Sequence, residues 1–251
     1  MRKTGRLMAA LSLSLVPLPA SAQAPTGNVA HIFRNSVKAG SQAPYEQGRK
    51  KHMEFHRLKG DAWAWFTWET LTGDNTGQYV IGSFGHAWKD FDGRRKFDAE
   101  DLVDAAASMG GFEVASTQAY YVFRADLSVA PPPTSAPAPF SQVTHFYLSP
   151  EGVNDFMDGI RKVNEGVQKT KYPSNAAWYQ LFNGGEGPEW VLVAARASWA
   201  EFAPPEKTLD AMMEEAYGKA PGAAALASLR KAIRYTRSEI LQYRPDLSYV
   251  P

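Results

Sequence analysis

Strand-like and helix-like hydrophobic patterns follow each other along the chain in an order that occurs twice. Alternating apolar positions and aromatic content predict strands at 29–37, 63–71, 78–88 and 118–124, and again at 143–148, 176–182, 189–199 and 239–244. Longer segments predict helices at 44–58, from about 99, at 153–170, from about 206 and at 223–235. The sequences GDNTG and GGEG separate the middle strands of each half, which predicts hairpins.

Residue identities also indicate an old duplication of the chain. Several aromatic residues of the first half reappear 111 positions later: Tyr45 matches Phe156, Trp88 matches Trp199, and Phe91 matches Phe202. The sequence RADLS from Arg124 matches RPDLS from Arg244 at an offset of 120. Each half therefore contains the order strand, helix, two strands, helix, strand.

This βαββαβ order is that of the ferredoxin-like fold, in which two helices cover one face of an antiparallel sheet. We therefore expect an α+β protein with two tandem ferredoxin-like repeats, whose sheets pack face to face in a barrel-like body. On this element order and the sequence GGEGPEWVLV, the chain resembles the dimeric α+β barrel superfamily over about 29–250. The resemblance extends more loosely to its NIPSNAP-like and stress-responsive A/B barrel members. It implies a fold only, since the superfamily includes haem-degrading and antibiotic-biosynthesis monooxygenases, isomerases and proteins of unknown role.

The first residues have the pattern of a secretory signal peptide. A basic start and the apolar run Leu7–Leu18 precede the small residues Ala20-Ser21-Ala22, which predicts cleavage after residue 22 and export to the periplasm or beyond. A retained membrane anchor is the alternative, but the apolar run is short and Pro17 interrupts it. No later segment is apolar enough to predict a membrane span. The absence of cysteine excludes disulfides and thiol chemistry.

The domain boundaries follow from a proline-rich sequence. PPPTSAPAP at 131–139 predicts an extended linker, so we expect a signal peptide at 1–22, one repeat at 27–130 and a second at 140–251. The formal net charge of +1 argues against a nucleic-acid partner.

Three histidines form the predicted metal site. At the offset of 111, His52 and His56 lie opposite Val163 and Val167 of an apolar helical stripe, so their imidazoles should face the sheet. Strand alternation places His86 on the same side as Val80, Gly82 and Phe84, the face expected to meet the helices. Three imidazoles can bind a transition metal, or one can ligate haem. The alternatives are a polar cluster without metal, and structural or solvent-exposed histidines. His31 and His145 occupy matching strand positions, which indicates a shared structural role.

The opposite face of the sheets forms the predicted ligand site. Its side chains should line a cleft between the sheets and bind a small apolar or aromatic molecule: Trp65, Thr67, Glu69, Trp178, Gln180 and Arg196. The alternative is that the tryptophans only fill the interface between the halves.

The sequence thus favours a protein that binds a small ligand and assigns no catalytic residue. A metal- or haem-dependent enzyme that uses the histidine cluster is one alternative. The other is a non-catalytic interaction module that forms homo-oligomers.

Overall fold

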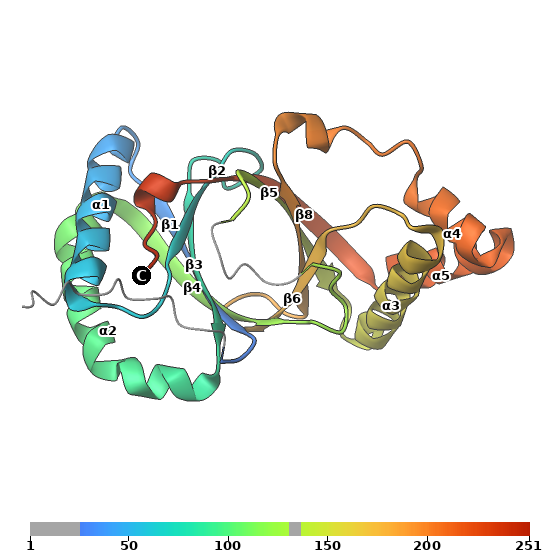
Figure 1. Cartoon of the computed structure of the whole chain (residues 1–251), viewed down its shortest axis with the longest axis horizontal. Helices are drawn as coiled ribbons and strands as arrows, with labels where there is room; N and C mark the ends of the chain where they lie inside the picture. Colours follow the sequence, from blue (N-terminus) through green and yellow to red (C-terminus); the bar gives the residue numbers. More distant parts are fainter. Residues whose placement is uncertain (1–25, 131–136) are drawn as a thin grey trace, which may run out of the picture.

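Eight antiparallel strands close into a barrel, and helices cover it on two opposite sides (Figure 1). The computed structural model describes residues 26–130 and 137–251, so the predicted signal peptide and most of the predicted linker lie outside the described residues. The strands are β1 (Val29–Val37), β2 (Phe66–Thr70), β3 (Tyr79–His86), β4 (Glu113–Phe123), β5 (Phe140–Leu148), β6 (Ala176–Asn183), β7 (Glu189–Arg196) and β8 (Ile233–Tyr243).

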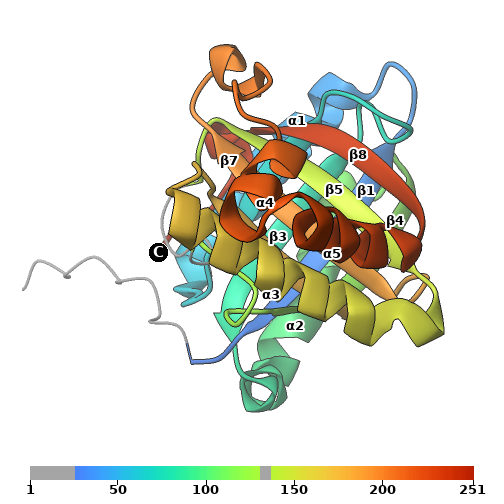
Figure 2. The ribbon, with the colours of Figure 1, turned by 90° about the vertical axis from the view of Figure 1, so that its right-hand side faces the viewer.

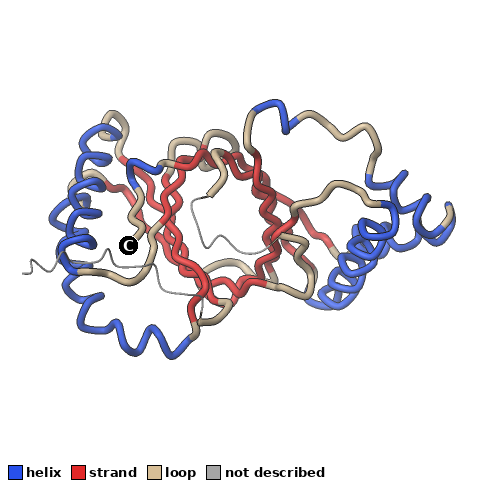
Figure 3. Tube along the Cα trace, viewed as in Figure 1, coloured by secondary structure: helices blue, strands red, loops and turns tan. Residues whose placement is uncertain are grey.

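The two halves contribute equivalent sheets to the barrel. The closed strand order β1-β3-β2-β8-β5-β7-β6-β4 contains β4-β1-β3-β2 from the first half and β8-β5-β7-β6 from the second. Antiparallel pairing of β2 with β8 and of β4 with β6 joins the sheets at both edges. The strands therefore form one continuous ring between the two helical layers (Figure 3), which confirms the predicted tandem ferredoxin-like α+β barrel.

Each half places its helices outside its own sheet. The first layer consists of α1 (Gln42–Lys59) and α2 (Trp88–Met109), and the second of α3 (Val153–Thr170), α4 (Leu209–Tyr217) and α5 (Lys219–Lys231). Figure 2 shows the second layer from outside. Short 3-10 helices are at Pro150–Gly152, Trp199–Phe202 and Pro245–Leu247. Among the described residues, no helix has the length and apolar character needed to cross a membrane.

Helix α2 begins earlier than its predicted start near residue 99. Strand β3 ends at His86, and Trp88 is the first helical residue. The Asp90 carboxylate accepts a hydrogen bond from the backbone N–H of Ala87 at 2.8 Å, which caps the helix at that point. In the second half the matching Trp199 begins only a 3-10 helix.

The matching segments RADLS and RPDLS each cross to the opposite half. After β4, the backbone N–H of Arg124 donates to the Trp178 carbonyl at 2.8 Å, and the Trp178 N–H donates to Ser128 Oγ at 2.8 Å. Leu127 is then fully buried in the core beneath α3, where it packs with Phe156. The end of the first half thus completes the core of the second.

The second crossing segment makes the same contacts in the first half. The backbone N–H of Arg244 donates to the Thr67 carbonyl at 2.8 Å, and the Thr67 N–H donates to Ser248 Oγ at 2.9 Å. Leu247 is fully buried in the core beneath α1. Thr67 and Trp178 are separated by the same 111 positions that relate the other repeated residues, so these contacts support the alignment of the halves.

Candidate functional site

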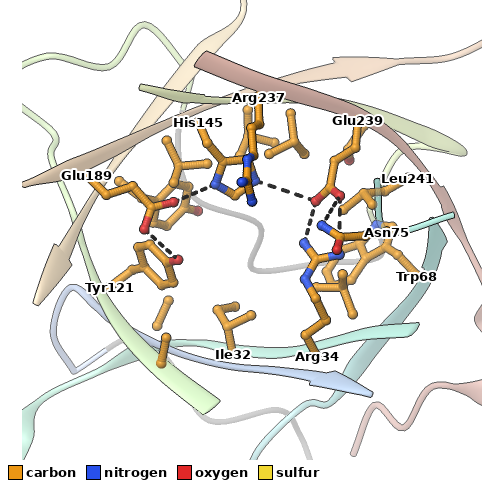
Figure 4. Close-up of a pocket in the computed structure, with 18 of the residues that line it drawn as sticks. Ile32, Arg34, Trp68, Asn75, Tyr121, His145, Glu189, Arg237, Glu239 and Leu241 are labelled. Atoms are coloured by element: carbon orange, nitrogen blue, oxygen red, sulfur yellow. Dashed lines mark hydrogen bonds and ion pairs between the residues drawn. The ribbon is translucent and has the colours of Figure 1, made fainter. Parts of the chain in front are cut away.

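The barrel encloses a cavity of about 750 Å³, which we call the lumen (Figure 4). Most of its wall is apolar and aromatic, with side chains that include Ile32, Trp68, Val80, Phe84, Val143, Tyr179, Val191 and Leu241. A band of polar side chains crosses this wall, and we call it the polar belt: Arg34, Tyr121, His145, Glu189 and Glu239. Ala130 and Pro137, which flank the undescribed residues 131–136, also line the lumen.

Strand alternation directs the belt residues inward. Along β1, Ala30, Ile32 and Arg34 line the lumen, whereas the alternate residues His31 and Phe33 pack with aromatic residues on the helix side. Glu189 and Glu239 occupy inward positions on β7 and β8 in the same way. Strands β1, β7 and β8 therefore direct the side chains of Arg34, Glu189 and Glu239 into the lumen.

The belt residues form a continuous chain of contacts. Arg34 donates to both carboxylate oxygens of Glu239. His145 lies between two carboxylates, with its Nδ1 2.6 Å from Glu189 and its Nε2 3.5 Å from Glu239. The Tyr121 hydroxyl donates to Glu189 at 3.3 Å. Two cationic and two anionic groups therefore alternate around one side of the lumen when His145 is protonated.

The contacts within the belt set its protonation. Burial opposes ionisation of Glu239, but hydrogen bonds and charge contacts with His145 and Arg34 outweigh it and lower its pKa to about 2. Burial also opposes protonation of His145, and its two carboxylate neighbours raise its pKa above the ordinary value. Burial, together with the charge of Glu189, raises the pKa of Tyr121. Glu239 is thus a carboxylate and Tyr121 a neutral phenol at neutral pH.

The residues predicted to bind a ligand lie outside the lumen. Trp65, Thr67, Glu69, Trp178, Gln180 and Arg196 are all absent from its wall. Trp65 packs beneath α1 with Tyr249, and Trp178 packs beneath α3 with Phe156. Glu69 pairs with Arg244, Thr67 accepts from Arg49, Gln180 accepts from Arg124, and Arg196 donates to Gln142.

The face predicted to line the cleft packs on the helices instead, and this has a simple physical cause. Both faces of β2, β3, β6 and β7 are largely apolar, because one face lines the lumen and the other packs on helices. Alternation therefore separates the two faces without showing which one is inside. Trp68 is the tryptophan of β2 that lines the lumen.

The predicted metal residues separate into a pair and a single histidine. His52 and His56 are buried on the side of α1 that faces α2. His86 instead stacks on Trp63, with ring centroids 3.5 Å apart, and its Nε2 lies 2.7 Å from Ser83 Oγ. A bulge explains its position: Gly85 has φ +82°, and the β1–β3 register shifts between the pairs Val29–His86 and His31–Ser83.

Burial also affects the protonation of these histidines. It lowers the pKa of both His52 and His86 to about 4. For His56, burial acts in the same direction, but the neighbouring carboxylates of Asp101 and Asp61 outweigh it and raise the pKa. The side chains that surround His52 and His56 are the carboxylates of Asp61, Asp101 and Asp104, and His86 is not among them.

His31 and His145 do not share the role that their alignment predicts. His31 packs on the helix side, where it stacks on Tyr120 and its Nε2 lies 3.1 Å from Gln118 Oε1. His145 faces the lumen. Strand alternation thus separates the pair, although each does make a side-chain contact across the sheet.

Sequence reasoning missed Arg34, Glu189 and Glu239. The available signal was a charged residue within an apolar strand, as in HIFRNSV, GPEWVLV and RSEILQY. A charge buried in this way normally has a partner of opposite charge. The partners come from β1, β5, β7 and β8, so only the barrel topology brings them together.

A haem group does not fit the histidines of this chain. All five are in the described part, and only His145 lines the lumen. Both of its ring nitrogens face carboxylates, so neither is free to ligate iron. His52 and His56 do not line the lumen, and their Nε2 atoms are buried against each other and Asp101 in the contact between α1 and α2.

Comparison with solved structures supports the fold at low sequence identity. A "putative monooxygenase" from Fusobacterium nucleatum matches with a TM-score of 0.55 and 11% identity over 86% of this chain and 92% of its own. An anthrone oxidase-like protein matches with a TM-score of 0.52 and 12% sequence identity over 87% of this chain and 92% of its own. A mutant chlorite dismutase from Candidatus Nitrospira defluvii matches with a TM-score of 0.51 and 9% sequence identity over 88% of this chain and 93% of its own.

These matches extend over most of both chains, and they show that this protein has the dimeric α+β barrel fold. No protein-family model and no curated protein matches the sequence. At identities of 9–12% the property that these proteins share with this chain is the fold, and one fold serves many activities.

Proposed function

We propose that this protein binds a small, mainly apolar molecule with a neutral hydrogen-bonding group inside the lumen. The observation that carries the proposal is the cavity of about 750 Å³ inside the barrel, lined mostly by apolar side chains and crossed by the polar belt. Cavities of about 300–1,000 Å³ with a few oriented polar groups are typical of small-molecule sites. The apolar wall would bury the body of the ligand.

The charges of the belt indicate the kind of polar group. Arg34 and protonated His145 are already balanced by Glu189 and Glu239. A charged ligand would add an unbalanced charge to this low-dielectric space, which is costly. A hydroxyl, carbonyl or amide could instead exchange hydrogen bonds with the belt without changing its net charge.

Dye binding tests this proposal. A neutral naphthylamine dye, whose fluorescence rises in apolar surroundings, should bind with one-to-one stoichiometry, and an anionic naphthalene sulfonate should bind more weakly. Val193 lines the lumen, so Val193→Trp should occupy part of the space and weaken dye binding. Val114 is 68% exposed, so Val114→Trp is the control for an added tryptophan and should bind like the natural chain.

Two results would contradict lumen binding. One is equal dye binding by Val193→Trp and Val114→Trp with both variants folded by circular dichroism. The other is no saturable binding by the natural chain.

The structure gives less support to the two other functional hypotheses. An enzyme that uses the histidine pair on a lumen ligand lacks the necessary contact, because neither His52 nor His56 lines the lumen. Oligomer formation through sheet edges is also disfavoured, because the described strands close on themselves and leave no unpaired edge.

We also propose that the protein is exported. The proposal rests on the basic, apolar and small-residue pattern of residues 1–22. Amino-terminal sequencing of protein from an expressing bacterium should give a mature chain that begins at Gln23, in an extracytoplasmic fraction. A cytoplasmic chain that retains residues 1–22 would contradict export.

A further inference from the structure

Two histidines and one aspartate meet in the contact between α1 and α2. His52 and His56 are one turn apart on α1, and Asp101 lies opposite them on α2. The Nε2 atoms of the histidines are 3.2 Å apart, and Asp101 Oδ1 is 3.3 Å from His52 Nε2 and 3.2 Å from His56 Nε2. The three atoms form a nearly equilateral triangle.

The other ring nitrogens are fixed by two further carboxylates. His52 Nδ1 lies 2.7 Å from Asp104 Oδ1, and His56 Nδ1 lies 2.8 Å from Asp61 Oδ2. Because a carboxylate accepts, each Nδ1 carries the proton and donates it. In the neutral tautomer each Nε2 therefore presents its lone pair to the triangle, as in metal-binding histidines that are oriented by a carboxylate.

The triangle is consequently a buried group of electron-pair donors. His52 and His56 are only 3% and 1% exposed. Asp101 Oδ1 is itself shielded from solvent and has no hydrogen-bond partner among the described residues. Three such atoms at van der Waals distance repel one another unless a cation or a proton lies between them.

We propose that His52, His56 and Asp101 bind one divalent transition-metal ion, for which Zn²⁺ is the best match. Zinc ligands at about 2.1 Å in tetrahedral geometry are about 3.4 Å apart, close to the separations in the triangle. Two imidazoles and one carboxylate are a donor set suited to zinc and to other first-row metals. Three protein ligands leave the fourth position for water.

The position of the triangle indicates a structural role for the metal. Helix α2 has 22 residues, but only Ser108 and Met109 are buried. Its contact with the rest of the molecule is thus thin for its length. A metal with ligands on both helices would fix α2 against α1, and the aromatic rings that pack around His56 would shield its imidazole from bulk solvent: Trp65, Phe97 and Tyr249.

Metal binding by the complete, untagged chain tests the proposal. After treatment with a chelator, titration with Zn²⁺ should give one site per chain by calorimetry and a higher melting temperature. The chain has no cysteine, so stoichiometric zinc binding must come from histidine and carboxylate groups. Mg²⁺, which prefers oxygen ligands, should produce no shift.

Variants locate the site. The double variant His52→Val with His56→Val copies the residues at the matching positions of the second half, so it should fold and lose zinc binding. His86→Ala removes a histidine outside the triangle and should retain the natural affinity. Asp104→Ala should weaken binding about 10–100-fold, and Asp104→Asn, which keeps an acceptor for His52 Nδ1, should weaken it less.

Three results would overturn the proposal. The first is no saturable Zn²⁺ binding by the folded natural chain, in which case a proton occupies the triangle. The second is unchanged affinity in the folded double valine variant. The third is loss of binding in His86→Ala with its fold intact. Since none of these variants changes a residue of the lumen wall, dye binding would continue to test lumen function separately.

Discussion

The two helical layers bury matching positions with opposite chemistry. In the first half, α1 meets α2 through His52, His56 and Asp101. At the offset of 111 these positions correspond to Val163, Val167 and Met212, which pack together in one apolar cluster of the second half. The contact between the two helices can therefore be made by polar side chains, which need a partner ion, or by valine and methionine side chains, which need none.

The comparison indicates how each layer obtains its stability. The second layer gains from apolar burial, and Gly166 lets the sulfur of Met212 approach closely, so that even a Cβ there would clash. The first layer keeps charged groups out of water, which is favourable only when all of them are paired. The loss of stability caused by a substitution in the first layer should therefore depend strongly on which charged partner the substitution removes.

The largest expected effect comes from Asp61. Its buried carboxylate accepts from His56, Arg94 and the Trp65 indole, so Asp61→Ala leaves Arg94 without its buried partner. We expect a loss of about 3–5 kcal/mol in the free energy of unfolding by urea titration. Asp98 pairs with Arg94 at the exposed end, so Asp98→Ala is the matched control and should cost less than about 1 kcal/mol. Equal losses would remove the distinction between buried and exposed partners.

Substitution of the buried leucine in each crossing segment should cost the two halves the same stability. Leu127 and Leu247 are both fully buried at equivalent positions. Leu127→Ala and Leu247→Ala should each lower the free energy of unfolding by about 3 kcal/mol, within the range for buried leucines. Urea unfolding measures both, and a difference above about 2 kcal/mol would show that the halves do not share this packing.

Acid should act on the lumen through Glu239. Its pKa is lowered to about 2 in the folded protein, below the ordinary value near 4.5, so its contribution is present above about pH 4.5 and is lost as pH falls toward 2. That contribution is about 3 kcal/mol. The pKa of His145 is raised, so its contribution is complete below about pH 6.5 and is lost as pH rises through the raised value.

Urea titrations across pH measure this dependence. Glu239→Gln should reduce the loss of stability between about pH 4.5 and 2 by the share of Glu239, and weaken the decline at higher pH, because His145 loses one of its carboxylates. An identical pH profile in the variant and the natural chain would show that this pair does not control stability.

The smallest effect on stability should come from replacing the three polar residues of the first layer by the apolar residues at the matching positions of the second. The triple variant His52→Val, His56→Val, Asp101→Met should be between neutral and about 2 kcal/mol more stable than the metal-free natural chain. Added Zn²⁺ should stabilise the natural chain and leave the variant unchanged. A large loss of stability without metal would mean that the two layers differ in backbone packing as well as in chemistry.

The repeat made the fold accessible from sequence. Hydrophobic periodicity and the offset of 111 gave the order of strands and helices, and hairpin sequences set most strand ends. The start of α2 was misplaced because Trp88 continues the alternation of β3 although it is already helical. Alternation alone describes side chains and not the backbone turn that follows His86.

The candidate sites were less accessible because they depend on long-range geometry. The sequence brought His52 and His56 together through their spacing of four, but Asp101 joins them only when α2 packs on α1. The bulge at Gly85 turned His86 toward Trp63, which no periodic pattern indicates. The polar belt requires four strands from both halves, so its pairs appear only after the barrel closes.

The exchange of the segments after Arg124 and Arg244 has an evolutionary consequence. In a barrel made from two identical chains, symmetry copies every substitution into both halves. Here each half still completes the core of the other, as two subunits would, but both belong to one polypeptide. Fusion thus preserves mutual dependence while it frees each half to change alone. A histidine pair could arise in one layer while valines remained in the other, so specialisation needed no second gene.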